Sequence, residues 1–166
     1  MTGSFTVNKA VFGPNGWIQS FDATFVQQCE GSTTSQATGE VDIENGPAPA
    51  QLAVTVTPAA TARVDKVSGQ ATVTGAVTCN ENATVGLSGA LNETLTRTKL
   101  ATGNWSVSGI ACSTTPATWT ATVIPTGNIP FASGKAQVSG TYSATDPVYQ
   151  VATSGTFSQD IQLRSK

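Results

Sequence analysis

The chemistry open to this chain is limited, because the sequence contains no histidine and only three cysteines. Nucleophilic catalysis by a Ser–His or Cys–His pair needs an imidazole as the general base, so that class of enzyme is excluded. Structural zinc sites use histidine or closely spaced cysteine pairs, and Cys29, Cys79 and Cys112 form no such pair. The sequence therefore predicts no metal site and no cofactor.

The cysteines fit an oxidised, exported protein better than a metal site. Cys79 and Cys112 each end a strand-like run of alternating apolar residues. A bridge between them would close a loop and stabilise the fold by roughly 3–4 kcal/mol, and we favour it over free thiols. Cys29 is then left unpaired. It is either a small buried hydrophobic residue or a cysteine whose partner lies upstream of Met1, and we favour the second interpretation.

Carboxylates provide no obvious catalytic pair. Glycoside hydrolysis needs two acids about 5–10 Å apart in a cleft, whereas the ten acids lie in expected turns or on polar strand faces. Glu40, Asp42 and Glu44 alternate along one expected strand, which spaces their side chains ~6–7 Å apart on one face. That spacing is wide for a single Ca²⁺ ion and favours a solvated face. We expect a protein that is not an enzyme.

The tryptophans suggest a ligand-binding alternative, since exposed aromatic rings can stack on sugars. Trp17 follows a tight turn at an expected hairpin tip, and Trp105 follows Gly103-Asn104. Trp119 lies in an alternating run and is expected in the core. Trp17 and Trp105 are therefore the candidate ligand-binding residues.

Composition indicates an all-β protein. Thr, Ala, Ser, Gly and Val dominate, and charged residues make up 11% of the chain, against ~25% in an average domain. The net charge is −2 and the basic residues are scattered, so no nucleic-acid partner is expected. No apolar run approaches the ~20 residues of a membrane span, and we expect no membrane partner. Met1 begins no recognisable signal peptide, so we expect any export signal to have lain upstream.

Turn residues divide the chain into two expected parts. Residues 1–45 contain a hairpin about the turn Gly13–Gly16 and a third strand at 37–44. Residues 46–50 are a Pro/Ala linker. Residues 51–166 contain seven or eight short strands, as in a β-sandwich. We expect them at 51–57, 62–67 (an edge piece), 70–79, 83–91, 104–112, 118–124, 136–144 and 151–163, with 93–100 either extending the fourth or forming a further strand.

Residues 51–166 resemble an immunoglobulin-like β-sandwich domain of unknown function from secreted actinobacterial and other bacterial proteins. The matching stretches are Ala71–Gly75, Cys79, Ala83–Leu87, Gly109–Cys112, Trp119–Val123, Phe131–Ala136 and Ile161–Arg164. The resemblance implies an antiparallel sandwich and a Cys79–Cys112 bridge, and it implies no activity.

Residues 2–43 resemble the C-terminal part of a β-rich module of bacterial extracellular proteins. The matching stretches are Thr2–Val7, Ala10–Pro14, Phe21–Phe25, Cys29–Gly31 and Gly39–Ile43. In those relatives a cysteine upstream of the first stretch pairs with the position of Cys29, and a histidine often occupies the position of Gln28. Here the upstream cysteine is missing and there is no histidine, so the resemblance carries no function over.

These observations favour a non-enzymatic structural or adhesive module of a larger protein, secreted or at the cell surface. The alternative is a module that binds carbohydrate or another ligand. The expected partners are neighbouring domains of the same polypeptide or a cell-surface polysaccharide.

Overall fold

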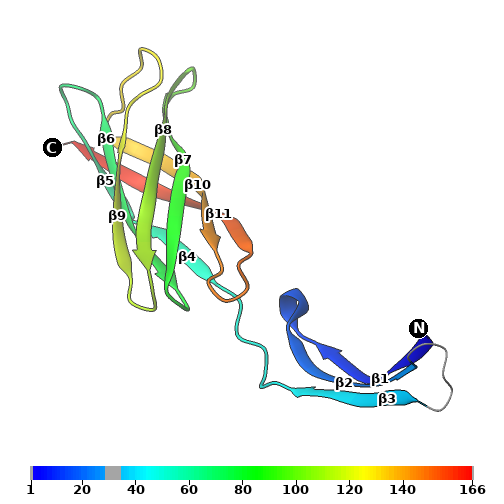
Figure 1. The fold of residues 1–166 in the computed structure, drawn as a ribbon. Coiled ribbons are helices and arrows are strands. Elements are labelled where there is room, and N and C mark those ends of the chain that lie inside the picture. Colours follow the sequence, from blue (N-terminus) through cyan, green and yellow to red (C-terminus); the bar gives the residue numbers. More distant parts are fainter. Residues whose placement is uncertain (1, 29–34, 166) are drawn as a thin grey trace. The chain divides into compact units, whose positions relative to one another are not determined.

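The computed structural model describes residues 2–28 and 35–165, and in them it is almost entirely β-structure (Figure 1). The described residues contain no α-helix. The strands are β1 (Thr2–Phe12), β2 (Ile18–Gln28), β3 (Gln36–Glu44), β4 (Val54–Pro58), β5 (Thr61–Val64), β6 (Ala71–Cys79), β7 (Ala83–Thr96), β8 (Lys99–Cys112), β9 (Ala117–Val123), β10 (Gly134–Thr145) and β11 (Ala152–Ser165). The chain divides into an N-terminal unit, residues 1–51, and a C-terminal unit, residues 52–166. The predicted all-β class is confirmed.

The N-terminal unit is a three-stranded antiparallel sheet in the order β1-β2-β3. A short 3₁₀ turn, Pro14–Gly16, joins β1 to β2. Asn15 and Gly16 have φ angles of +52° and +78°, the left-handed values that the Asn-Gly pair predicts. Two irregularities in the β1–β2 register, between Val7 and Lys9 and between Val11 and Phe12, mark β-bulges. Cys29 lies outside the described residues.

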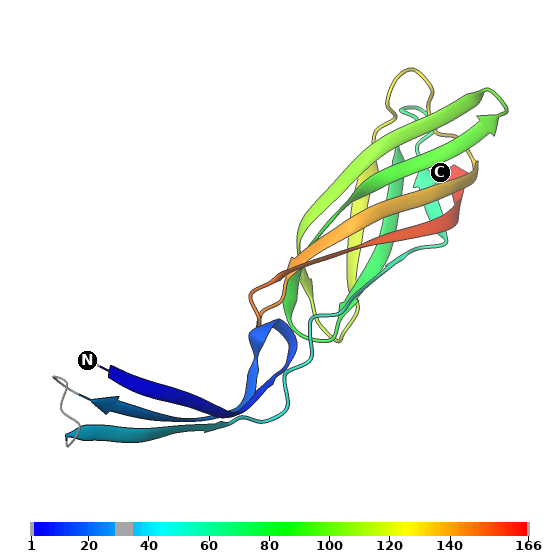
Figure 2. The same cartoon turned by 90° about the vertical axis from the view of Figure 1, so that its right-hand side faces the viewer.

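The C-terminal unit is a β-sandwich whose two layers are linked through β5. One layer contains β4, β6 and β9, and the other contains β11, β10, β7 and β8. Figure 2 shows β7 and β8 (green), β10 (orange) and β11 (red) side by side, with β6 (teal) and β9 (yellow) in the other layer. Strand β5 pairs antiparallel with β6 and parallel with β11. It therefore hydrogen-bonds to both layers, and its prediction as an edge piece is wrong.

The core of the sandwich is built on aromatic rings that lie over glycines. Trp119 faces Gly75, Trp105 faces Gly89, and Phe157 faces Gly140, each pair directly opposite on neighbouring strands. A Cβ atom on Gly75 would lie 2.6 Å from the ring of Trp119, so only glycine leaves room for the ring to lie flat. The indoles of Trp105 and Trp119 stack with centroids 5.1 Å apart and join the two layers.

Two details of the long hairpin β7–β8 concern where its strands end and which face one of its residues occupies. The segment 93–100 does not form a separate strand: β7 runs on to Thr96, and β8 begins at Lys99. Ile110 is 9% exposed and belongs to the core, although strict alternation from Trp105 places it on the opposite face. The reason is the positive φ of Gly109 (+72°), which accompanies an irregular register between the pairs Val85–Ile110 and Leu87–Val107.

Candidate functional site

Strand register gathers polar side chains on the outer face of the layer β7-β10-β11. Asn92 on β7 lies opposite Gln137 on β10, and Gln137 lies opposite Asp160 on β11. One step along the same strands, Lys135 lies opposite Gln162. Because these strands alternate inward apolar with outward polar residues, the side chains collect in two adjacent rows.

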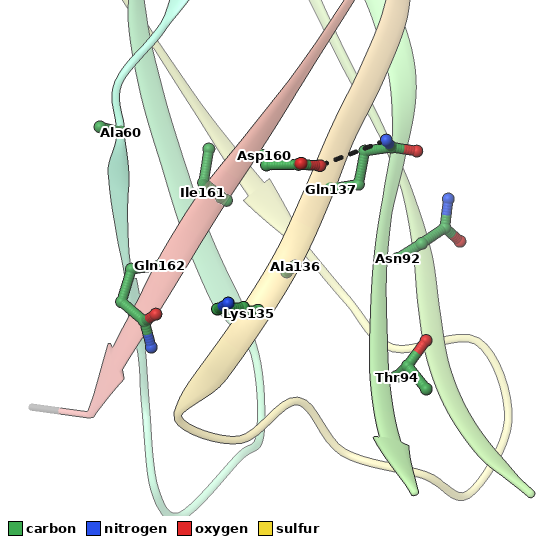
Figure 3. A pocket seen from close by; sticks show the side chains of 9 residues that line it. All are labelled: Ala60, Asn92, Thr94, Lys135, Ala136, Gln137, Asp160, Ile161 and Gln162. Atoms are coloured by element: carbon green, nitrogen blue, oxygen red, sulfur yellow. Dashed lines mark hydrogen bonds between the residues drawn. The ribbon is translucent and has the colours of Figure 1, made fainter. Parts of the chain in front are cut away.

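The two rows line an open groove of about 650 Å³ (Figure 3), which we call the outer groove. Its lining also includes Thr94 from β7 and Ala60, whose carbonyl accepts a hydrogen bond from the Gln162 amide at 2.9 Å. Gln137 Nε2 donates to Asp160 Oδ1 at 3.3 Å, the interaction drawn as a dashed line. Within the described ranges, Lys135 makes no ion pair within 4 Å.

The outer groove offers hydrogen-bonding chemistry. Its lining supplies amides, a hydroxyl, one carboxylate and one ammonium group, which can bind a polyhydroxylated or otherwise polar ligand. One carboxylate does not provide the acid pair that hydrolysis of a glycosidic bond requires. No aromatic side chain lines this groove, so the groove has no ring on which a sugar could stack.

The structure places the two candidate tryptophans in different units. Trp105 is 5% exposed, and its ring stacks on that of Trp119 and contacts the tilted ring of Phe157. Its indole is thus part of the core, which corrects its assignment as an exposed stacking residue. Trp17 follows the 3₁₀ turn at the tip of the β1–β2 hairpin, as expected, but it is half-buried against Gly13. A ligand-binding role for Trp17 stays a prediction.

The predicted Cys79–Cys112 disulfide is present, with an S–S distance of 2.08 Å. It connects the end of β6 in one layer to the end of β8 in the other. Both cysteines are buried, at 2% and 3% exposure. The bridge therefore fastens the two layers of the sandwich at one end.

A buried carboxyl group, Glu93, lies under the connection between β9 and β10. Its side chain is 1% exposed, and Oε2 accepts a hydrogen bond from the Ala132 amide at 2.8 Å. Its other oxygen, Oε1, has no hydrogen-bond partner among the described residues. Burial raises the pKa of this carboxyl, and the Ala132 hydrogen bond opposes the shift without cancelling it.

A second buried carboxyl group, Asp146, organises the turn between β10 and β11. It accepts hydrogen bonds from the amides of Val148 and Tyr149, both at 2.9 Å, and of Leu52 at 2.7 Å. The bond from Tyr149 is the main cause of a lowered pKa, and those from Leu52 and Val148 act in the same direction. Asp146 thereby ties the start of the C-terminal unit to a turn 94 residues further along the chain.

Sequence reasoning missed Asn92, Gln137, Asp160 and Glu93, for two different reasons. The groove residues alternate outward on their own strands, but only the pairing of β7, β10 and β11 brings them together. Glu93 could have been found, because it continues the inward series Leu87, Gly89, Leu91 once β7 is extended beyond Leu91.

Residues 2–28 and 35–165 contain neither a candidate metal cluster nor a membrane-spanning helix. Those residues contain no cluster of three or more His, Cys, Asp or Glu side chains that could hold a metal ion. Glu44, one of the three alternating acids of β3, forms an ion pair with Lys9 at 2.6 Å. In the ranges that the structure describes, no helix is long and apolar enough to cross a membrane.

Comparison with known proteins adds no identification: no family model matches the chain, and no curated protein matches it.

Proposed function

We propose that the protein is a non-enzymatic structural module of a larger extracellular protein, in which the C-terminal unit acts as a spacer that carries load. The observation that carries this proposal is the position of the chain ends in the sandwich. The chain enters β4 at one end and leaves β11 at the opposite end (Figure 1). A unit with this geometry can be placed in series between other domains.

The terminal strands are paired in a way that resists extension. Pulling at the two ends of the unit slides β5 along β11, because these strands run parallel and Thr61–Val64 pair with Gln162–Ser165. The hydrogen bonds of this parallel pair are evenly spaced along strands that are sheared lengthwise, so they share the load and break together rather than one after another. Further along the chain, the Cys79–Cys112 bridge prevents the enclosed segment from extending at all.

The same topology supports a relationship to immunoglobulin-like sandwiches. The first strand of the unit is split into β4, which pairs with β6, and β5, which pairs with β6 and β11. The bridge departs from the antibody pattern, where the disulfide joins the second and sixth strands. In this unit β10, which precedes the last strand β11, takes the place of that sixth strand. The bridge instead joins β6 to β8, which comes two strands earlier in the chain than β10. Disulfides persist in oxidising compartments, which supports a secreted or cell-surface location.

Single-molecule stretching of the chain held at both ends tests the spacer function. The C-terminal unit should give one unfolding event at high force when oxidised. After reduction, the gain in contour length should increase by about 110 Å, because the 33-residue separation between the cysteines is released at ~3.5 Å per residue. A C-terminal unit that extends gradually at low force would overturn the proposal.

A second candidate function, binding of a polysaccharide or another polyhydroxylated ligand, is favoured by the outer groove. A glycan array is the direct test, with Gln137→Ala and Asp160→Asn as groove variants. Ser154→Ala, on an exposed position of β11 away from the groove, is the matched control. Trp17→Ala tests the remaining tryptophan. No binding to any glycan, or binding that all four variants retain, would remove this candidate.

A further inference from the structure

One face of the N-terminal sheet is apolar over most of its length, and we call it the apolar face. Strand register places its residues together around the central strand β2: Phe25 pairs with Phe5 and Gly39, Ala23 with Val7 and Val41, and Phe21 with Ala10 and Ile43. Beyond the second bulge, Phe12 pairs with Ile18 on the same face. All of these positions are apolar and carry no charge, and the polar side chain of Gln27, which pairs with Gly3 and Ala37, follows at one end of the face.

Nothing in the described part of the N-terminal unit covers this face. Phe5 is 60% exposed, Phe12 59% and Val7 48%. Among the described residues of this unit, only Ser20 and Ala23 are buried. A sheet with one hydrophobic face has to bury that face against another element, and contiguous apolar patches of this kind mark interaction sites.

The apolar face is ordered internally before it meets a partner. The ring of Phe25 lies across Gly39, where any Cβ would clash with the ring, and the rings of Phe5 and Phe21 stack with centroids 6.5 Å apart. Rings held in this way lose little conformational freedom on binding, which favours association with another apolar surface.

Charge distribution narrows the choice of partner. The opposite face carries Asp22, Asp42 and the Lys9–Glu44 ion pair. Residues 1–51 contain one lysine and five carboxylates, a net charge of −4. This charge disfavours an anionic lipid surface and nucleic acid, both of which need basic residues. A second copy of the chain offers an apolar face of equal size and buries no charge.

The area of the face suits a dimer. Strands β1 and β2 have 11 residues each, which gives a face roughly 35 Å long at ~3.4 Å per residue. Three strands at ~4.8 Å spacing give a width of about 14 Å and a footprint on the order of 500 Å². Two copies together bury about 1,000 Å², which reaches the ~1,000 Å² that a biological interface should clear and lies below the ~1,200–2,000 Å² of standard-size interfaces.

We propose that the apolar face binds the same face of a second copy of the chain, so that two three-stranded sheets pack into a six-stranded sandwich. The contact is isologous, as in most homodimers. The charged faces of both sheets then point to solvent, and the sheets pack ~10 Å apart, the usual spacing of stacked sheets. This inference does not depend on the proposed spacer function, because it concerns the other unit.

Two substitutions on one strand test the proposal. Val7 and Val11 are 48% and 41% exposed but lie on opposite faces, since Val7 pairs with Ala23 and Val11 with Ser20. Sedimentation velocity on the 166-residue chain, with Cys29→Ser to prevent intermolecular disulfides, should show a dimer at micromolar concentrations. Val7→Lys should raise the dimer dissociation constant at least tenfold, because it places an unpaired charge between the sheets. Val11→Lys should leave the constant unchanged.

A monomeric chain and association through another surface each give a result different from the one expected. Circular dichroism checks that both variants keep their strands. A chain that is monomeric up to several hundred micromolar overturns the proposal. Association that both variants retain places the contact at the strand edges or in the C-terminal unit, and it also overturns the proposal. Val41→Lys, on β3 of the apolar face, should weaken the dimer as Val7→Lys does, and a normal dimer of that variant would contradict a face-to-face contact.

Discussion

Five glycines each face an aromatic ring on the neighbouring strand, and four of these pairs lie in the C-terminal unit. They are Gly39 with Phe25, Gly75 with Trp119, Gly89 with Trp105, Gly140 with Phe157, and Gly155 with Tyr142. Each ring occupies the space that a side chain at the glycine would need. The sandwich thus fills its core with a few large rings and compensates for its many small residues.

Gly89 gives the sharpest test of this packing. A Cβ at this position would overlap the Ser139 carbonyl oxygen and lie 2.9 Å from the ring of Trp105. Gly89→Ala should lower the unfolding free energy by about 1–3 kcal/mol, the usual cost of overpacking. Gly86→Ala is the matched control on β7, because its Cβ meets only Ser143, and its effect should stay within ~0.5 kcal/mol. Urea unfolding measures both, and equal effects would contradict the packing argument.

Glu93 should make the folded state less stable as the pH rises, which is the opposite of what most carboxylates do. Its pKa is raised from the ordinary value of 4.5, so the folded chain binds this proton more tightly than the unfolded chain. Its favourable contribution is complete below pH 4.5 and is lost as the pH rises through the raised pKa. Glu93→Gln should therefore raise the melting temperature relative to wild type more at pH 8 than at pH 4.

Thermal melts of the wild type and Glu93→Gln at both pH values isolate this effect from the other carboxylates. Asp160→Asn, which removes an exposed carboxylate from the outer groove, controls for the change in net charge. If the melting temperatures of the wild type and Glu93→Gln differ by the same amount at both pH values, the burial of Glu93 does not control its ionisation.

The turn at Asp146 joins elements that are far apart in the chain. Asp146→Ala should lower the melting temperature of the C-terminal unit by several degrees, because three backbone amides lose a charged acceptor. Asp65 is a matched control: it accepts similar bonds from Val67 and Ser68 in an exposed turn with no link to a distant strand. Asp65→Ala should therefore have the smaller effect. A larger effect at Asp65 would contradict the role assigned to the Leu52 bond.

The disulfide joins the ends of β6 and β8, and it should hold the layers together after other contacts weaken. Reduction, or the double substitution Cys79→Ser and Cys112→Ser, should lower the unfolding free energy by about 3–4 kcal/mol for a sequence separation of 33. The denatured, unreduced chain should contain one free thiol from its three cysteines. Three free thiols would show that the bridge does not form.

Strand positions could be predicted from the sequence, but strand pairing could not. Period-2 alternation and turn residues locate nearly every strand to within a few residues, and the Asn15-Gly16 turn follows from its residue types. Pairing depends on contacts between residues distant in the chain. The parallel β5–β11 pair and the row Asn92–Gln137–Asp160 therefore leave no local signal. The burial of Trp105 could not be predicted for the same reason. Its ring stacks on Trp119 in the other layer, and alternation along one strand does not show which residues of two layers meet.

The two units differ in how completely they bury their own apolar residues. The C-terminal unit contains a cluster of buried hydrophobic residues drawn from seven of its eight strands, β5 to β11, including Val73, Leu91 and Leu163. The N-terminal unit has one buried hydrophobic residue among those described, Ala23. The free energy of unfolding should therefore be large and intrinsic for the C-terminal unit. For the N-terminal unit it should depend on what covers the apolar face.

This difference predicts two unfolding transitions with separate controls. Trp17 reports on the N-terminal unit, and Trp105 and Trp119 report on the C-terminal unit. In urea, the transition followed by Trp17 should come first and should move to higher urea as protein concentration rises, because a dimer is stabilised by mass action. The later transition should not depend on concentration, and it alone should move to lower urea on reduction of Cys79–Cys112.

Trp17→Phe should remove the first transition from the fluorescence signal and leave the second in place. A single transition that responds to both concentration and reduction would contradict independent units, because it would mean that the sandwich unfolds only together with the three-stranded sheet.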